Sequence, residues 1–284
     1  MSTSGGTAGT LYVVATPIGN LGDFTQRAIE TLKSADVILA EDTRQTLKLL
    51  NHFGIVAKKL DRLDANAPDR DIYRAVEALE KGSSIALVTD AGTPSVSDPG
   101  DALVKKAIAC GVRIVPIPGA SAALAALVAS GLAGGAGFRF FGFFPRSSRA
   151  PMIAMIAATP EPVILFESPE RTTDSLKELA AAMPARPCAV ARELTKMHEE
   201  IVRGTLESLA SAEREWRGEI AIVLGAWAPE SREDEINDAA IDERIDRELA
   251  SGLHSKTIAE RLAAWSGRPK REIYERVIAR KNKE

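Results

Sequence analysis

Several features that would place a chain in a common protein class are scarce in this sequence of 284 residues. Its two cysteines, Cys110 and Cys188, have no pairing motif, so we expect both to be reduced and buried, as is usual in cytoplasmic proteins. The three histidines show no ligand spacing with each other or with the cysteines, so we expect no metal site. No stretch approaches the roughly 18 uninterrupted apolar residues of a membrane-spanning helix, so we expect no membrane segment.

Known targeting and nucleotide-binding signals are also missing. Residues 1–9 are rich in Ser, Thr and Gly without an apolar core, so we expect a frayed lead-in to a cytoplasmic protein rather than a signal peptide. The first apolar run is followed by Thr16-Pro17-Ile18-Gly19-Asn20 rather than by a G-x-G-x-x-G sequence, and no Walker A sequence occurs. These absences argue against a dehydrogenase and against a P-loop enzyme.

What the sequence does contain is an alternation of short apolar runs with helix-like segments. Continuous apolar runs are typical of buried parallel strands, and the alternation predicts an α/β domain with helices on both faces of a parallel sheet. Strands are predicted at Leu11–Ala15, Val37–Ala40, Ile85–Thr89 and Arg113–Ile117, and helices at Phe24–Ser34, Arg44–Phe53, Asp71–Lys81 and Ala102–Cys110.

The second half alternates less regularly, which favours a mixed or antiparallel sheet. A Gly-rich stretch followed by the polar segment Pro145–Ser148 indicates a linker, and it places the boundary between two α/β domains within Ala120–Ser148. We expect domains at 10–120 and 121–228, and a helical, partly basic C-terminal extension at 230–284. The predicted elements are strands at Val163–Glu167, Cys188–Glu193, Glu199–Gly204 and Glu219–Gly225, and helices at Thr172–Ala182, Glu235–Ala250, Lys256–Trp265 and Pro269–Lys281.

The loop from Asp90 to Gly100 is the sharpest candidate for a ligand site. It follows a predicted strand, at the sheet edge where α/β proteins bind ligands, and its small residues let a ligand approach the backbone. Asp98 and Pro99 near its end also suit a helix N-terminus, as the cap and the first helical residue. We interpret Asp90–Pro94 as ligand-binding and leave both interpretations open for the end of the loop.

Polar turns follow other predicted strands as well. Helix capping accounts for Asp42 or Thr43, whereas Glu41 and Arg44 need another role. For Ser121, capping and ligand binding both stay open. These turns are Thr16–Leu21, Glu41–Arg44, Pro118–Ala122 and Glu167–Arg171.

The turn in the second half follows the same pattern. Ser168 suits a helix cap and Pro169 suits the first helical position. Nothing comparable accounts for Glu167 and Arg171, so we treat both as candidate site residues.

Six short motifs, taken in order, make the chain resemble one known family. The motifs are TPIGNLGD, EDTR, DAGTPSVSDPG, PGASA, GFFPR and ESPERT. Together they resemble the RsmI-type 16S rRNA (cytidine 2′-O)-methyltransferases of the tetrapyrrole-methylase superfamily, from Leu11 to about Gly225. The helical tail is also similar to the C-terminal extension of that family.

The resemblance implies a tetrapyrrole-methylase fold, with two α/β domains, S-adenosylmethionine in the cleft between them, and a homodimer. It implies methylation of the ribose of a decoding-centre cytidine in 16S rRNA, within the small ribosomal subunit. The usual Gly-Asp-Pro of the superfamily is Gly92-Thr93-Pro94 here, so a carboxylate is missing at Thr93. The implied cofactor contacts fall on Pro17, Ala91, Gly92, Thr93, Val96, Ser121, Ala122, Glu167 and Leu194.

Methyl transfer to a hydroxyl is an in-line displacement, in which a group that orients or deprotonates the hydroxyl adds roughly 10²–10⁴-fold. We select Asp90 and Asp42 for this role, and Arg44 and Arg171 as ligands of RNA phosphates, with capping or surface ion pairing as the alternative for each. We interpret Lys196–Glu200 as a solvated loop. Two other functions stay open, a tetrapyrrole (precorrin) methyltransferase and a non-enzymatic RNA-binding module.

The tail bears on this choice because a net charge of −3 is unusual for an RNA-binding protein. Residues 230–250 include nine acidic and three basic residues, whereas residues 256–284 include nine basic and four acidic ones. The reversal predicts a local cationic face, with Lys270 and Arg271 as RNA ligands, and a purely structural tail is the alternative. The Gly267–Pro269 turn is reminiscent of a helix-turn-helix unit.

Overall fold

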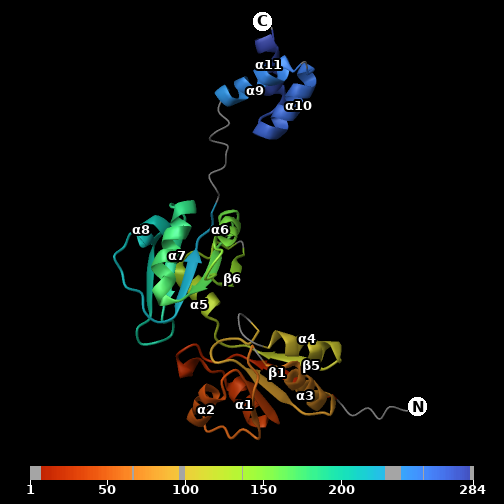
Figure 1. Cartoon of the computed structure of the whole chain (residues 1–284), viewed down its shortest axis with the longest axis vertical. Coiled ribbons are helices and arrows are strands. Elements are labelled where there is room, and N and C mark those ends of the chain that lie inside the picture. Colours follow the sequence, from red (N-terminus) through yellow and green to blue (C-terminus); the bar gives the residue numbers. More distant parts are fainter. Residues whose placement is uncertain are drawn as a thin grey trace, which may run out of the picture. The chain divides into compact units, whose positions relative to one another are not determined.

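The computed structural model describes residues 8–65, 67–95, 100–135, 137–227, 238–251 and 253–281. The chain divides into two compact units, Met1–Trp227 and Ala228–Glu284. The first unit contains two five-stranded sheets, and the second contains three helices (Figure 1). Most of the predicted lead-in lies outside the described residues. At Gly9 the prediction of fraying is wrong, because the N–H of Gly9 donates to the carbonyl of Leu79 at 2.7 Å.

The first sheet is parallel throughout, with strand order β3-β2-β4-β1-β5. The apolar runs give the four predicted strands to within one residue. Strands β2 and β4 are buried as predicted, whereas β5 lies at the sheet edge and is only partly buried, so the prediction of burial is wrong for β5. Strand β3 was not predicted, because its three residues lie at the sheet edge and carry no apolar run. The strands are β1 (Thr10–Val14), β2 (Val37–Ala40), β3 (Leu60–Arg62), β4 (Ile85–Val88) and β5 (Arg113–Ile117).

Helices cover both faces of this sheet, as the alternation predicts. Helices α1 (Gln26–Ser34) and α2 (Thr43–His52) pack in one apolar cluster with the sheet, and α3 (Asp69–Glu80) and α4 (Asp101–Ala109) pack in another. Helix α4 begins after Gly100, which is its N-cap with a φ of 122° and no side-chain cap. The interpretation of Asp98 as the helix cap and of Pro99 as the first helical residue is therefore wrong. Both residues lie outside the described part of the chain.

The second sheet is mixed, with order β6-β7-β10-β8-β9. Strands β6 and β7 are parallel, and the other neighbours are antiparallel. One face packs against α5, and the other packs against α6, α7 and α8. The elements are α5 (Ala122–Ser130), β6 (Arg139–Phe143), α6 (Ala150–Ala157), β7 (Val163–Glu167), α7 (Pro169–Ala182), β8 (Pro187–Arg192), β9 (Glu200–Thr205), α8 (Leu206–Ala210) and β10 (Ile220–Leu224).

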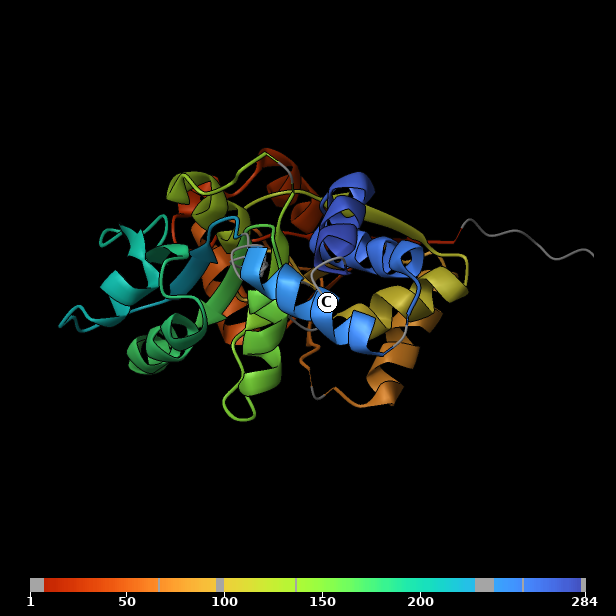
Figure 2. The ribbon, with the colours of Figure 1, turned by 90° about the horizontal axis from the view of Figure 1, so that it is seen from above.

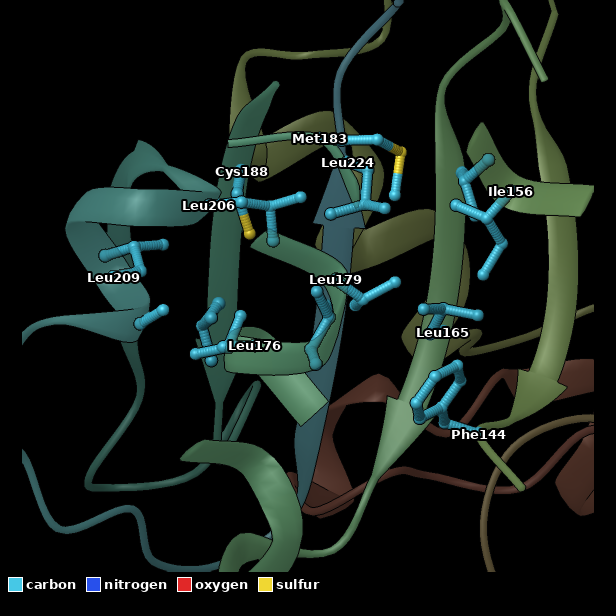
Figure 3. Close-up of a cluster of buried hydrophobic side chains, with 14 of the residues drawn as sticks. Phe144, Ile156, Leu165, Leu176, Leu179, Met183, Cys188, Leu206, Leu209 and Leu224 are labelled. Carbon is cyan, nitrogen blue, oxygen red and sulfur yellow. The ribbon is translucent and has the colours of Figure 1, made fainter. Parts of the chain in front are cut away.

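The larger core of the second sheet lies under α7. Figure 3 shows Leu176 and Leu179 of this helix among side chains of the sheet such as Leu165 and Leu224. The predicted linker is confined to the loop between β6 and α6, because α5 and β6 occupy much of the segment assigned to the domain boundary. Cys188 is buried in this core, whereas Cys110 is exposed, so the prediction that both thiols are buried is wrong for Cys110.

The second unit is a bundle of α9 (Asp238–Ala250), α10 (Ser255–Ser266) and α11 (Lys270–Lys281), as Figure 2 shows. Apolar residues at helical spacing pack inward, with Ile258, Leu262, Ile273 and Val277 buried together, whereas Trp265 is exposed. Throughout the described part of the chain, none of the helices has the length and apolar character needed to cross a membrane.

Candidate active site

A small backbone bridge joins the loops that follow β1 and β4. The N–H of Thr16 donates to the carbonyl of Gly92 (2.8 Å), and the N–H of Gly92 donates to the carbonyl of Thr16 (3.2 Å). The buried Thr16 hydroxyl also donates to the carbonyl of Thr89 (3.1 Å). The bridge holds the buried Pro17 beside the loop that begins at Asp90, so two predicted cofactor segments come together.

Gly92 has a backbone conformation that favours glycine, with a φ of +83°. A Cβ at this position would lie 3.6 Å from Ile18 Cγ2 and 4.0 Å from the carbonyl oxygen of Ala120, which are ordinary contact distances. Backbone conformation, more than lack of space, therefore calls for glycine here. Because both backbone groups of Gly92 pair with Thr16, neither is free to bind a ligand.

The free backbone donors of this loop belong to the residues on either side of Gly92. The N–H groups of Ala91 and Thr93 make no hydrogen bond within the described residues. The Thr93 hydroxyl donates to the carbonyl of Ala120 (3.5 Å), which links this loop to the one after β5. Val96, a further predicted cofactor contact, lies outside the described residues.

The loop after β5 leads into α5. Ser121 is the N-cap of this helix, and its hydroxyl accepts a hydrogen bond from the N–H of Leu124 at 3.5 Å. Ala122 is the first helical residue and, like Ser121, is partly exposed. A Cβ on Gly119 would lie 2.9 Å from Cβ of Ala15, so the close approach to the end of β1 requires glycine. The cofactor roles of Ser121 and Ala122 stay predictions.

Three carboxylates gather where β2 and β4 end. These strands are parallel neighbours, so Glu41 and Asp42 lie next to Thr89 and Asp90. The Thr89 hydroxyl donates to the Glu41 carboxylate (2.6 Å), and the N–H of Asp42 donates to Oδ1 of Asp90 (3.1 Å). The structure thus brings the two candidate catalytic carboxylates together at the edge of the sheet.

The two candidate carboxylates are used differently. Asp42 caps α2 by accepting from the N–H of Arg44 (2.8 Å), and its carboxylate pairs with the Arg44 guanidinium (2.6 Å). The hydrogen bond from the Arg44 side chain is the main cause that holds the pKa of Asp42 well below its ordinary value. The pKa of Asp90 is raised, mainly by desolvation and further by the charges of Glu41 and Asp42. Asp90 is therefore the better proton acceptor of the two.

Glu167 and Arg171 are held in a buried network. The Glu167 carboxylate accepts hydrogen bonds from the Ser175 hydroxyl (2.5 Å) and the N–H of Ser168 (2.8 Å), and it pairs with the Arg171 guanidinium. Arg171 also donates to the Ser168 hydroxyl (3.0 Å), so Ser168 is the N-cap by position without capping through its side chain. The expectation that both charges lack a structural role is wrong. Their roles toward cofactor and RNA stay predictions, and the Glu167 carboxylate is already engaged by its neighbours.

The turn at residues 193–199, after β8, contacts the loop after β1. The N–H of Asn20 donates to Oγ1 of Thr195 (3.1 Å), and the Lys196 side chain lies where a Cβ on Gly19 would be. The interpretation of this segment as a solvated loop is wrong for Lys196. Asn20 lies in the predicted turn Thr16–Leu21 and Thr195 follows the predicted cofactor contact Leu194, but neither residue was itself predicted as part of the site.

Leu194 lies in an apolar cluster that joins the second sheet to loops of the first. The cluster includes Ile18 from the loop after β1, Ala120 from the loop after β5, Ala122 at the start of α5, and residues of the second sheet. Two predicted cofactor positions, Leu194 and Ala122, therefore share one cluster with the loop that carries Pro17.

Two surface cavities adjoin the second sheet. One has a volume of about 640 Å³ and is lined by residues 146–150 and parts of α6 and α7, and the other, about 610 Å³, is lined by residues 214–218 and the start of α7. Neither is lined by a predicted cofactor residue. Within the described ranges no group of three or more His, Cys, Asp or Glu side chains is arranged to hold a metal ion.

The acidic helix α9 neutralises much of the predicted cationic face of the tail. Arg276 pairs with Asp238 and Asp242 (both 2.9 Å), and Arg280 pairs with Asp242 (2.8 Å) and Asp246 (2.6 Å). These acidic residues recur every four positions, so they share the face of α9 that meets α11. The expectation of outward, free cations is therefore wrong for Arg276 and Arg280.

The predicted RNA ligands of the tail have weaker partners. Lys270 pairs with Glu260, and Arg271 pairs with Glu275 of its own helix (3.0 Å) while its side chain stays 90% exposed. Such exposed pairs exchange easily for a phosphate. Four other basic residues take part in no ion pair within the described part of the tail, namely Arg244, Lys256, Arg261 and Lys281.

Comparison with known proteins gives matches over most of the chain. Residues 10–210 match the family described as Tetrapyrrole (Corrin/Porphyrin) Methylases. The chain is 43% identical over 271 residues to Ribosomal RNA small subunit methyltransferase I from Halalkalibacterium halodurans, covering 94% of this chain and 93% of that protein. It is 38% identical over 273 residues to the protein of that name from Bacillus subtilis, covering 94% and 93%.

Solved structures of lower identity share the fold. A diphthine synthase has a TM-score of 0.60 at 19% identity and covers 76% of this chain and 90% of that chain. Uroporphyrin-III C-methyltransferase from Thermus thermophilus, in complex with S-adenosyl homocysteine, has a TM-score of 0.55 at 23% identity and covers 76% and 97%. Given these matches, the chain belongs to the tetrapyrrole methylase family and, within it, to the family of ribosomal RNA small subunit methyltransferase I.

Proposed function

We propose that the chain is an S-adenosylmethionine-dependent methyltransferase of 16S rRNA that modifies the ribose 2′-oxygen of a decoding-centre cytidine in the small ribosomal subunit. One observation carries the choice of substrate. Relatives named for small-subunit rRNA methylation are 38–43% identical over most of the chain, whereas the tetrapyrrole methyltransferases of the same fold are about 20% identical. The tetrapyrrole alternative is correspondingly weaker.

Several features of the chain suit S-adenosylmethionine, which supplies the methyl group on a sulfonium. The free N–H groups of Ala91 and Thr93 are donors for an adenosine or a carboxylate. Gly92 keeps this loop free of a side chain, and the bridge to Thr16 fixes it beside Pro17. The nearby carboxylates, Asp90 among them, favour the positive charge of a sulfonium. We assign these residues, with Ser121, Ala122 and Leu194, to the cofactor site.

Asp90 is the residue that we assign to the substrate hydroxyl. Its Oδ1 is held by the N–H of Asp42, while Oδ2 accepts no hydrogen bond within the described residues. We assign to Oδ2 of Asp90 the role of accepting the proton of the 2′-hydroxyl while the ribose oxygen attacks the methyl group. Asp42 contributes by positioning Asp90 through its N–H and by fixing the start of α2. We therefore revise the pair of candidates into one proton acceptor and one positioning residue.

Basic residues at three places are proposed to bind RNA phosphates. The Arg44 side chain is 87% exposed at the start of α2, within reach of the charge of Asp90. Arg171 is mostly covered and tied to Glu167, so we expect a smaller contribution from it. In the tail, Arg271 and Lys270 are the predicted contacts that remain accessible. We thus assign RNA ligands to the start of α2, to the start of α7 and to the helical unit.

We further propose that the protein is a cytoplasmic homodimer. Helix α5 supports a dimer, because its side chains Leu124 and Val128 are 49% and 73% exposed on an otherwise apolar helix. Apolar residues exposed together on one helix commonly mark a subunit interface.

Methyl transfer to separate substrates tests the rRNA assignment against a tetrapyrrole methyltransferase and a non-enzymatic RNA-binding module. Purified chain is incubated with labelled S-adenosylmethionine and either small ribosomal subunits lacking the modification or a uroporphyrinogen. The account predicts transfer to 16S rRNA alone. Transfer to the tetrapyrrole alone contradicts it, and RNA binding without cofactor binding by calorimetry identifies a non-enzymatic module instead.

A further inference from the structure

The turn at 193–199 combines backbone strain with an exposed tip. Glu193 and Thr195 have φ values of +49° and +67°, in a region that residues with a Cβ seldom adopt. Strain of this kind persists only where the surrounding structure enforces it, and it gathers at functional sites. At the tip, Met197 is 93% exposed and His198 is exposed beside it.

The base of the turn is fixed by charged side chains. The Glu193 carboxylate accepts hydrogen bonds from the N–H of Glu219 (2.9 Å) and from Nζ of Lys196 (2.9 Å). The Glu199 carboxylate accepts one from the N–H of Thr195 (2.6 Å). Three hydrogen bonds therefore hold the strained backbone, and the side chains of the two tip residues take no part in them. The base of the turn is therefore fixed, and its tip stays exposed.

Contacts place this turn at the rim of the proposed active site. Thr195 accepts the N–H of Asn20, on the loop that carries the predicted cofactor residue Pro17. The preceding Leu194 packs with Ile18 of the same loop. The loop is in turn bridged to the one that begins at Asp90.

We propose that Met197 and His198 pack against an unstacked nucleobase of the RNA next to the methylated ribose. This inference rests on the proposed function. Proteins recognise single-stranded RNA through bases that are turned out of the stack and laid against aromatic or apolar side chains. A methionine thioether makes favourable contacts with aromatic rings, and an imidazole ring stacks on a base.

The chemistry of the tip favours RNA over a second copy of this chain. Interfaces between permanently associated subunits are largely apolar at their centre. Here one apolar side chain, Met197, stands among Lys196, His198, Glu199 and Glu200. A single apolar contact surrounded by polar groups suits a base, whose flat face is apolar and whose edges carry hydrogen-bond donors and acceptors.

The test uses the full chain with the variants Met197→Ala, His198→Ala and their combination. Met197→Leu keeps the apolar contact, and Met155→Ala on α6, where the side chain is 51% exposed, is the matched control. Steady-state kinetics with small ribosomal subunits give KM and kcat, and calorimetry gives the affinity for S-adenosylmethionine. We expect KM for the subunit to rise about 10-fold in the double variant, as for loss of about one stacking contact. Cofactor affinity and melting temperature should stay unchanged, and Met197→Leu and Met155→Ala should match the parent.

An unchanged KM in the double variant, with the parent active, overturns this inference and leaves the proposed function standing. A change in molar mass by light scattering, with the KM effect following dissociation, assigns the tip to a subunit interface and also overturns it. A parent chain that does not methylate rRNA contradicts the proposed function, and this inference with it.

Discussion

The N–H of Asp42 donates to Oδ1 of Asp90 at 3.1 Å, so the loop after β2 holds the carboxylate that follows β4. The Asp42 carboxylate is itself turned to Arg44 and the start of α2. The bond therefore separates the roles of two residues that the sequence presents as equivalent. One carboxylate keeps a free oxygen, and the other supports it.

Substitution of the two carboxylates tests this separation. Asp90→Asn keeps the shape and the hydrogen bond from Asp42 but removes the proton acceptor, so turnover should fall about 10²-fold or more. Asp42→Asn keeps a good helix cap and the backbone N–H, so turnover should fall far less. Single-turnover methylation of small subunits gives the rates, and calorimetry should show near-normal cofactor affinity for both. Near-normal turnover in Asp90→Asn would remove the carboxylate from the mechanism.

The pH dependence of the rate follows from the raised pKa of Asp90. A base works only when deprotonated, so activity is present above its pKa and is lost as pH falls through it. The acid limb of the single-turnover profile should therefore lie above the ordinary Asp value of about 3.9. Since a raised pKa means that ionisation of Asp90 opposes folding, Asp90→Asn should be neutral or slightly stabilising at neutral pH in urea unfolding. A marked loss of stability would show that the charge supports the fold.

Gly92→Ala tests the cofactor loop, with Gly111→Ala as its control. Both glycines have positive φ, +83° and +73°, and a Cβ at Gly111 meets nothing within 4 Å. Both substitutions should lower the free energy of unfolding by about 1 kcal/mol. Only Gly92→Ala should weaken cofactor binding, by about 10-fold or more, because relief of the strain displaces the N–H groups of Ala91 and Thr93. Equal cofactor affinities by calorimetry would exclude this loop from the site.

Two arginines of α11 distinguish packing from RNA binding in the tail. Arg276→Ala removes the pairs with Asp238 and Asp242. Amide hydrogen exchange in the helical unit should therefore become faster, as for a loss of about 1 kcal/mol of local stability. Arg271→Ala should leave that exchange unchanged and weaken RNA binding several-fold. The slope of log affinity against log salt concentration should become smaller by about the contribution of one phosphate contact. Filter binding over a salt series measures the second effect. Identical slopes for parent and Arg271→Ala would reduce α11 to a structural element.

Local pattern was sufficient for four of the five strands of the parallel sheet and for the convergence of the polar turns that follow them. Apolar runs gave the strands β1, β2, β4 and β5, and the polar turns directly after them converge because parallel strands end at one edge. Glu41, Asp42 and Asp90 meet for that reason. What pattern could not supply is long-range pairing, since the bond between Thr16 and Gly92 joins residues 76 positions apart.

The remaining errors share this physical cause. The tail was interpreted as cationic because charge was counted along the chain, whereas packing places Asp242 of α9 against Arg276 and Arg280 of α11. Glu167 and Arg171 lacked a role for the same reason, since they are explained by each other and by the fold around them. A charge becomes a candidate ligand only after its partners in space are known.

Ribose-methylation mapping of 16S rRNA from a strain that lacks the gene for this chain tests whether the chain modifies a decoding-centre cytidine through Asp90. Small subunits from that strain are incubated with S-adenosylmethionine and either the parent chain or Asp90→Asn. The account predicts that the parent restores one 2′-O-methyl group on a cytidine of the decoding centre and that the variant restores it at least about 10²-fold more slowly. A decoding-centre cytidine that is still methylated in the strain without the gene would contradict this assignment. A methyl group restored on a base or elsewhere in the RNA would contradict it too.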